Sequence, residues 1–239
     1  MKVYLDNCVL IDIEKGKYSL SDFKKEGYEY FYSDAHINEL RRGLSNDPNL
    51  KGIRLNTISQ LCGTNFIVPD ASGFSMGVEQ KEPVEVFVLS EIFDCLIKKC
   101  EESADSFHPD RDGILKELSM NKIEVGNIKE ESIFEVIDER MRNSVNRFGL
   151  HEYLKRSVAY TGRTTFLTLF NLLDAAYYWK DDKNLNRTYD AFHTYFAQYC
   201  DVLATNDKRL AIKSKAVYHY LNITTKVFSV EAFLKDSRR

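Results

Sequence analysis

The chain has 239 residues and a formal net charge of −3, with 44% hydrophobic and 29% charged residues. This length is sufficient for a substantial core, and the 14 Tyr and 15 Phe residues argue against extensive disorder. The small net charge excludes a polycation made to coat nucleic acid, so local patches must hold any anionic ligand.

Cysteine usage and apolar segments indicate a reduced compartment. The cysteines form an odd set without a C-x-x-C pair, which favours free thiols over a disulfide framework or a zinc site: Cys8, Cys62, Cys95, Cys100 and Cys200. Asp6 and Asp12 interrupt the first apolar stretch, which argues against a signal peptide. Residues 166–179 include Asn171 and Asp174 and are too short to cross a bilayer. We therefore expect a cytoplasmic protein with no membrane segment.

The first part of the chain predicts alternating strands and helices. Residues 2–5 are suited to a buried strand, which ends in Asp6. Residues 8–14 predict a short helix that ends at Gly16, and residues 30–32 predict a second strand. In open parallel sheets, functional groups collect beyond the carboxyl ends of strands, which is where Asp6 would lie.

A helix is expected after the second strand, with Ser33 or Asp34 as its N-cap and its end near Arg42. Helical spacing divides its residues between two sides. The core side holds Ile37, Leu40 and Leu44, and the far side holds His36, Glu39 and Gly43.

The middle of the chain reads mainly as helices. A third strand at residues 65–68 is followed by a loop at 70–77, where two Gly and two Ser residues gather. From there the pattern changes to predicted helices at residues 84–100, 133–141 and 165–179, with a capped turn at 110–113.

The α/β alternation returns near the C-terminus. A helix over residues 190–200 would begin at Asp190, and a strand over residues 201–204 would lead to Thr205 and Asp207. A basic helix comes next. A final strand at 226–228 precedes Ser229, the expected N-cap of a last short helix.

These elements bring carboxylates towards one edge of a parallel sheet. Asp6 and Asp207 follow strands, while Glu39 and Asp190 lie on helices. Two unit charges 4 Å apart repel by about 4 kcal/mol at an effective dielectric of 20, so such a cluster must take up protons or bind cations. All-oxygen ligands favour Mg²⁺ or Mn²⁺.

Three segments, in this order, resemble the signature blocks of the PIN domain family of metal-dependent nucleases: YLDNCVLID, YSDAHINELRRG and DAFHTYFAQYCDVLATNDKRL. The last block is the most specific, with its D-x-x-H-x-x-x-A run and a T-x-D after a strand. The resemblance covers roughly the first 70 and the last 50 residues. It departs from the family where Cys8 follows Asn7, since the family often has a small polar residue and then Asn after the first Asp. It implies a three-layer α/β/α sandwich with a central parallel sheet.

The resemblance also implies roles for individual residues. The catalytic and metal-binding acids would be Asp6, Glu39, Asp190 and Asp207, with Asp174 or Asp182 left open as a replacement for or addition to Asp190. Supporting positions would be Thr205, Asn7 and His193. Flanking cations that could bind substrate are Arg41, Arg42, Lys208 and Arg209. His36 and His193 lie beside the acids in sequence and could act as a general base or as structural hydrogen-bonding groups.

The whole chain is thus expected to be one PIN-like domain, residues 1–239, with a large helical insertion at residues 82–185. The implied activity is Mg²⁺- or Mn²⁺-dependent endoribonuclease cleavage, by a free-standing enzyme or by the toxic half of a two-component system, with RNA as partner. Two alternatives remain open, a DNA nuclease and a non-catalytic binding module of the same fold. A homo-oligomer and a protein inhibitor are also left open.

Overall fold

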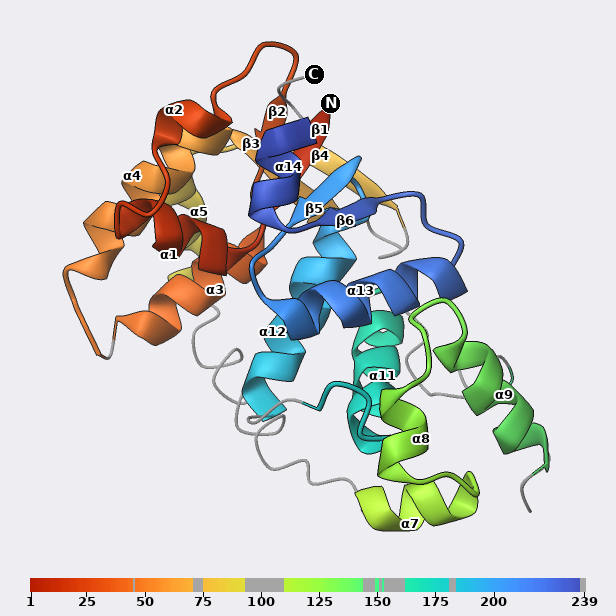
Figure 1. The fold of residues 1–239 in the computed structure, drawn as a ribbon. Coiled ribbons are helices and arrows are strands. Elements are labelled where there is room, and N and C mark those ends of the chain that lie inside the picture. Colours follow the sequence, from red (N-terminus) through yellow and green to blue (C-terminus); the bar gives the residue numbers. More distant parts are fainter. Residues whose placement is uncertain are drawn as a thin grey trace.

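The computed structural model describes most of the chain, namely residues 1–44, 46–70, 75–92, 110–143, 149–150, 152, 162–180 and 184–236. It is a mixed α/β fold with a four-stranded parallel sheet and many helices (Figure 1). Cys8, Cys62 and Cys200 lie in the described part and carry free thiols, whereas Cys95 and Cys100 lie outside it. Every helix described is too short or too polar to cross a membrane.

The main sheet has the strand order β2-β1-β5-β6, and all neighbouring pairs are parallel. Its strands are β1 (Lys2–Leu5), β2 (Glu29–Phe31), β5 (Val202–Ala204) and β6 (Lys226–Phe228), which confirms four predicted strands. The chain passes from β1 outward to β2 and from β5 outward to β6. The order therefore reverses between β1 and β5, and such a switch point opens a crevice at the carboxyl ends of the two strands.

The third predicted strand belongs to a different sheet. β3 (Asn65–Pro69) pairs antiparallel with β4 (Met76–Gln80), and a single parallel bridge joins Tyr32 to Phe66. The loop predicted at residues 70–77 is wrong at its end, because Met76 and Gly77 are already in β4. The Gly and Ser residues there gave a turn signal, but Met76 and Val78 pack against the core and favour the strand.

The helices of the first part are α1 (Asn7–Glu14), α2 (Leu20–Phe23), α3 (Asp34–Gly43), α4 (Leu50–Cys62) and α5 (Pro83–Ile92). Those of the remainder are α7 (Arg111–Glu117), α8 (Lys122–Gly126), α9 (Ile133–Asn143), α11 (Gly162–Ala175), α12 (Asn184–Ala197), α13 (Lys208–Tyr220) and α14 (Val230–Asp236). Helices were predicted at most of these places. The rest of the helix expected at residues 84–100, beyond Ile92, lies outside the described residues.

Two hydrophobic cores lie on opposite faces of the sheet, because successive strand side chains point to opposite sides. Val3 and Leu5 pack with helices α1, α3, α4 and α14, while Tyr4 and Leu203 pack with α7, α9, α11, α12 and α13. Figure 1 shows these two groups of helices on either side of the strands. This arrangement is compatible with a three-layer α/β/α fold. The helices of the middle segment share one continuous core with the sheet.

The helix that carries Asp190 starts earlier than its sequence suggested. α12 begins at Asn184, six positions before Asp190 (190 − 184), so Asp190 lies within the helix and not at its start. Residues 184–188 are mainly polar, so the local sequence pattern does not indicate that the helix begins there. Arg187 and Thr188 are nevertheless buried, so tertiary contacts favour the additional helical turns.

Candidate active site

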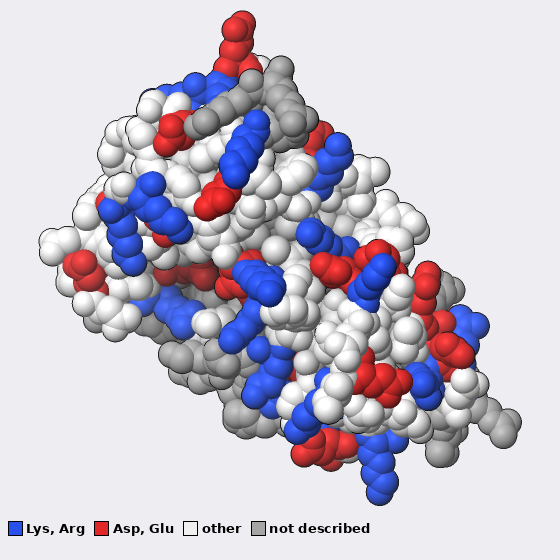
Figure 2. Space-filling model, in the orientation of Figure 1, with Lys and Arg blue, Asp and Glu red and all other residues white. Residues whose placement is uncertain are grey.

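The four predicted acids line one cavity. This acid pocket, of about 210 Å³, is bounded by Asp6, Glu39, Asp190 and Asp207 together with Asn7, Asn186 and Arg209. It lies beyond the carboxyl ends of β1 and β5, at the switch point of the sheet. Figure 2 shows acidic side chains inside a hollow with basic side chains at its rim. Residues far apart in the sequence thus meet at the predicted edge.

Asp6 is the most deeply placed of these acids. Its backbone N–H continues the β1–β5 ladder to the carbonyl of Ala204, at 3.0 Å. Its side chain caps α1. The residue is only 5% exposed, so both carboxylate oxygens need hydrogen-bond partners. Oδ1 accepts the Asn7 amide at 2.7 Å, and Oδ2 accepts the Thr205 hydroxyl at 2.9 Å. These bonds fix the plane of the carboxylate.

Asp207 is the N-cap of α13. Its Oδ1 accepts the amides of Arg209 and Leu210 at 2.7 and 3.0 Å, and its own N–H donates to Thr205 Oγ1 at 2.9 Å. The Thr205 hydroxyl therefore joins the two acids, since it donates to Asp6 and accepts from the Asp207 amide. The T-x-D spacing places a hydroxyl between two carboxylates that follow neighbouring strands.

His193 on α12 contacts two of the acids. Its Nε2 lies 3.1 Å from Glu39 Oε2 and 4.0 Å from Asp6 Oδ1. Burial lowers the pKa of His193, but the Glu39 hydrogen bond and the charges of Glu39 and Asp6 outweigh burial and raise it overall. The imidazolium form thus offsets part of the repulsion between the two carboxylates.

A buried hydrogen-bonded chain continues behind His193. The Tyr4 hydroxyl lies 2.9 Å from His193 Nδ1 and 2.7 Å from Ser33 Oγ. His36 Nδ1 accepts the Ser33 amide at 3.2 Å, and His36 Nε2 donates to the carbonyl of Leu5 at 2.8 Å. This chain connects Glu39 to the end of the strand that carries Asp6.

The far side of α3, predicted to lie opposite the core stripe, is covered by protein as well. His36 is 1% exposed and packs beside His193 and Tyr4, while Glu39 turns towards the acid pocket. The helix is covered on both sides because α12 packs against it. Burial and the nearby charge of His193 lower the pKa of His36 well below its ordinary value, so His36 is neutral.

The residues after Asp6 are supported by an ion pair from α4. Arg54, 4% exposed, makes a two-pronged contact with Glu14, with N–O distances of 2.5 and 2.9 Å. A further guanidinium nitrogen donates to the side-chain oxygen of Asn7. Cys8 also lines the acid pocket, and burial followed by the charge of Asp6 raises the pKa of its thiol, which stays protonated.

The four cations predicted to hold substrate are distributed unevenly. Arg209 lines the acid pocket, and Lys208 lies with its Nζ 4.7 Å from the ring of Trp179. Arg42 stacks near Tyr189, with its guanidinium carbon 5.9 Å from the ring centroid. Arg41 turns to α5, where it donates to the carbonyl of Phe87 at 3.2 Å. The role of each in substrate binding stays a prediction.

Asp174, considered as a replacement for Asp190, belongs to a separate buried cluster. Its side chain is 0% exposed and accepts from Arg187 at 2.9 Å and from Arg111 at 2.7 Å. Asp190 is the acid of α12 that lines the acid pocket. Asp182 lies outside the described residues.

The donor chemistry of the acid pocket suits a hard divalent cation, because carboxylate oxygens are the ligands that Mg²⁺ and Mn²⁺ prefer. In the described part of the chain, no three His, Cys, Asp or Glu side chains stand close enough together to form a preassembled metal site. The suitability of the acid pocket for a divalent cation thus depends on its carboxylate donors and on the fact that the four acids line the same cavity.

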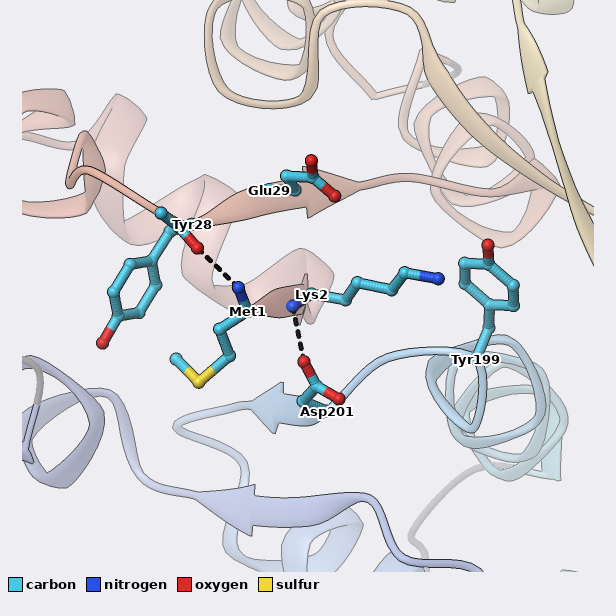
Figure 3. A pocket seen from close by; sticks show the side chains of 7 residues that line it. Met1, Lys2, Tyr28, Glu29, Tyr199 and Asp201 are labelled. Atoms are coloured by element: carbon cyan, nitrogen blue, oxygen red, sulfur yellow. Dashed lines mark hydrogen bonds between the residues drawn. The ribbon is translucent and has the colours of Figure 1, made fainter.

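A second cavity, of about 560 Å³, opens at the opposite edge of the sheet, where the strands begin. Figure 3 shows the Lys2 amide donating to Asp201, and the Lys2 side chain reaching towards Tyr199, 3.9 Å from Nζ to the ring centroid. Glu29 completes this side of the wall. The Asp201 carboxylate accepts from the Lys2 amide, and the N-terminal ammonium donates to the Gly27 carbonyl, so these two charges of the cavity join β1 to its neighbours.

Comparison with known proteins provides no further identification. No protein-family model matches the chain, and no curated protein or solved structure matches it either.

Sequence patterns missed several residues that hold the site in place. Tyr4 was expected only as part of a strand, and Ser33 only as a cap, yet their hydroxyls bond each other behind the acids. Arg54 lies on α4, a helix that was not predicted. The available signals were Tyr4, in a strand expected to be buried, and His36 and His193, on the two helices that carry Glu39 and Asp190. Their importance becomes visible only when these elements are packed together.

Proposed function

We propose that this chain is a metal-dependent nuclease with a PIN-like three-layer α/β/α fold, which hydrolyses phosphodiester bonds, preferably in RNA. One observation carries the proposal: Asp6, Glu39, Asp190 and Asp207, from separate segments, line a single cavity of about 210 Å³. Its place at the switch point of a parallel sheet also supports a binding function, since ligands of open α/β sheets bind there. The resemblance of the three sequence blocks supplies the reaction class.

In this proposal Asp6 and Asp207 are the central ligands of Mg²⁺ or Mn²⁺, and Glu39 and Asp190 bind directly or through water. Such an ion, when bound, lowers the pKa of the attacking water and offsets charge that develops on the phosphate.

The chain's own groups orient the acids and the substrate. Thr205 holds the Asp6 carboxylate through its hydroxyl, and His193 holds Glu39. Because these partners are already in place, the carboxylates need little reorganisation when a charged ligand enters. Arg209 supplies a guanidinium that can bind a phosphate through two donors.

The test is cleavage of labelled single-stranded RNA and single-stranded DNA with Mn²⁺, repeated after addition of a chelator. We expect cleavage that the chelator abolishes and that falls at least 100-fold in Asp6→Asn and Asp207→Asn. Asp201→Asn is the matched control, because Asp201 lies at the other end of β5 and lines the opposite cavity. Full activity of either folded acid variant contradicts the assignment, and the two nucleic acids decide between RNA and DNA.

A further inference from the structure

A larger groove adjoins the acid pocket on the side of β6. It has a volume of about 510 Å³ and lies between α13 and the segment where β6 passes into α14. Asp207 lines both the groove and the acid pocket, and Thr205 also lines the groove. A ligand held at the acids can therefore extend into the groove without leaving the protein surface.

One wall of the groove is a face of α13. Lys208, Ile212 and Lys215 all line it, and they occupy positions i, i+4 and i+7 of the helix. Residues with this spacing lie on one side of a helix, so two ammonium groups flank an apolar side chain. Lys215 is exposed, which leaves its charge available to a phosphate in solution.

The opposite wall is apolar and firmly held. Val227 and Phe228, at the end of β6, line the groove and are half-buried. Val227 packs against the core on the side of α13, and Phe228 packs against the core on the side of α14. The carbonyl of Phe228 accepts the Thr205 amide at 3.0 Å, so this aromatic residue is fixed relative to the residue that bonds Asp6. Glu130 also lines the groove, and a carboxylate there can accept a hydrogen bond from a base amino group.

Trp179, the only tryptophan of the chain, contacts Lys208, which lines this groove. Its ring centroid is 4.7 Å from Nζ of Lys208, and its backbone has a φ of 49°, which is rare for a bulky residue. Strained residues of this kind persist where the surrounding structure holds them, often beside binding sites. Because it is the only tryptophan, the fluorescence of Trp179 reports on changes beside Lys208.

We propose that this groove binds an unpaired nucleoside of the polynucleotide whose phosphodiester lies at the acid pocket. The inference rests on the proposed function, and it adds a subsite to it. The groove is the size of a small-molecule site, roughly 300–1,000 Å³, which accepts one or two nucleosides but not a duplex. Partly exposed apolar and aromatic side chains give a base a surface to stack on, and lysines pair with the adjoining phosphates.

The binding experiment uses the full chain in EDTA, so that no strand is cut. Single-stranded RNA and DNA 12-mers and the matching duplex are titrated, with Trp179 fluorescence and the anisotropy of an end label as readouts. We expect saturable binding of single strands, with an affinity about 5-fold or more below wild type in Lys215→Gln and in Phe228→Leu. Lys226→Gln, at the amino end of β6, is the control and should bind like wild type.

Phe228→Leu conserves most of the side-chain volume, so its fold is expected to survive, and circular dichroism checks this. Equal affinity for duplex and single strands, or wild-type affinity of both groove variants, overturns the proposal.

A second measurement separates this inference from the proposed nuclease activity. With Mn²⁺, oligonucleotides shortened step by step from each end are tested for cleavage. We expect wild type to lose efficiency when the nucleoside that reaches the groove is removed, while Phe228→Leu cuts long and short substrates alike. If cleavage occurs but the groove variants show the same length dependence as wild type, the groove inference fails and the nuclease stands. If nothing is cut but single-strand binding depends on Lys215 and Phe228, the nuclease fails and the groove stands.

Discussion

The imidazole rings of His36 and His193 lie 4.8 Å apart, centroid to centroid, and the protein moves their pKa values in opposite directions. Burial first, then the charge of His193, lowers the pKa of His36, while Glu39 and Asp6 outweigh burial and raise that of His193. The difference follows from their partners. His36 donates to a neutral carbonyl of Leu5, whereas His193 faces a carboxylate. The two adjacent histidines therefore differ: the surroundings of His193 favour its charged form, and those of His36 favour its neutral form.

The first prediction concerns stability and pH. Because the folded state raises the pKa of His193, this residue contributes stability that is fully present below its unfolded pKa, about 6.5, and lost as pH rises through the folded value. His36 acts oppositely, since its lowered pKa makes acid destabilising below about pH 6.5. The stability difference between wild type and His193→Gln should thus shrink from pH 6 to pH 9 in urea titrations with EDTA. A difference that stays constant over this range argues against a charged His193.

Divalent metal should raise the melting temperature. A ligand at about 100 times its Kd adds roughly 2.7 kcal/mol, which corresponds to about 5–10 °C for a chain of this size. We expect such a shift with Mn²⁺ in scanning fluorimetry of wild type and Asp201→Asn, and its loss in Asp6→Asn. If wild type shows no shift and cuts no nucleic acid, the binding-module interpretation replaces the nuclease.

Arg54 should be important for stability through its buried partner. Its side chain is 5% exposed and that of Glu14 is 8% exposed, so Arg54→Met leaves an uncompensated carboxylate and should cost about 3–5 kcal/mol. The double variant Glu14→Gln, Arg54→Met should recover much of this loss in urea unfolding. Lys17→Met removes an exposed pair with Asp12 and should change stability by at most about 1 kcal/mol. Equal losses in the single and double variants would contradict the buried-charge explanation.

Asp174 should be structural. Asp174→Asn leaves Arg187, 1% exposed, beside a neutral group, and we expect a loss of about 3–5 kcal/mol. The folded variant should nevertheless retain the Mn²⁺-induced melting shift and metal-dependent cleavage. Abolition of both in folded Asp174→Asn would return Asp174 to the acidic site.

The central strand should tolerate little loss of volume. Leu203 is 0% exposed in β5, so Leu203→Ala should destabilise the fold by about 2–5 kcal/mol in urea unfolding. Ile123 is 78% exposed on α8, and Ile123→Ala provides a matched control with a change within about 0.5 kcal/mol. Similar losses in the two variants would show that β5 is not central to the core.

Local patterns were sufficient for the parts of this protein whose determinants are close together in the chain. The strand before Asp6 and the strand before Thr205 each depend on a few neighbouring residues, and the structure has them where they were predicted. That Asp207 caps α13 was seen only in the structure. The carboxyl ends of parallel strands share one edge by geometry, so the meeting of Asp6 and Asp207 followed from the sequence as well.

Only the tertiary structure decided how these acids are held. Glu39 meets His193 across 154 positions of the chain, and Tyr4 meets His193 across 189. No local window contains such pairs. The first forms because α3 and α12 pack against each other, and the second joins α12 to β1. α12 also extends back to Asn184, and there the buried Arg187 pairs with Asp174 of α11, while His36 of α3 is buried beside His193 and Tyr4. The free energy gained when whole faces of helices and sheet are buried outweighs the secondary-structure propensity of single residues. The packing of these elements therefore determines where each functional side chain lies.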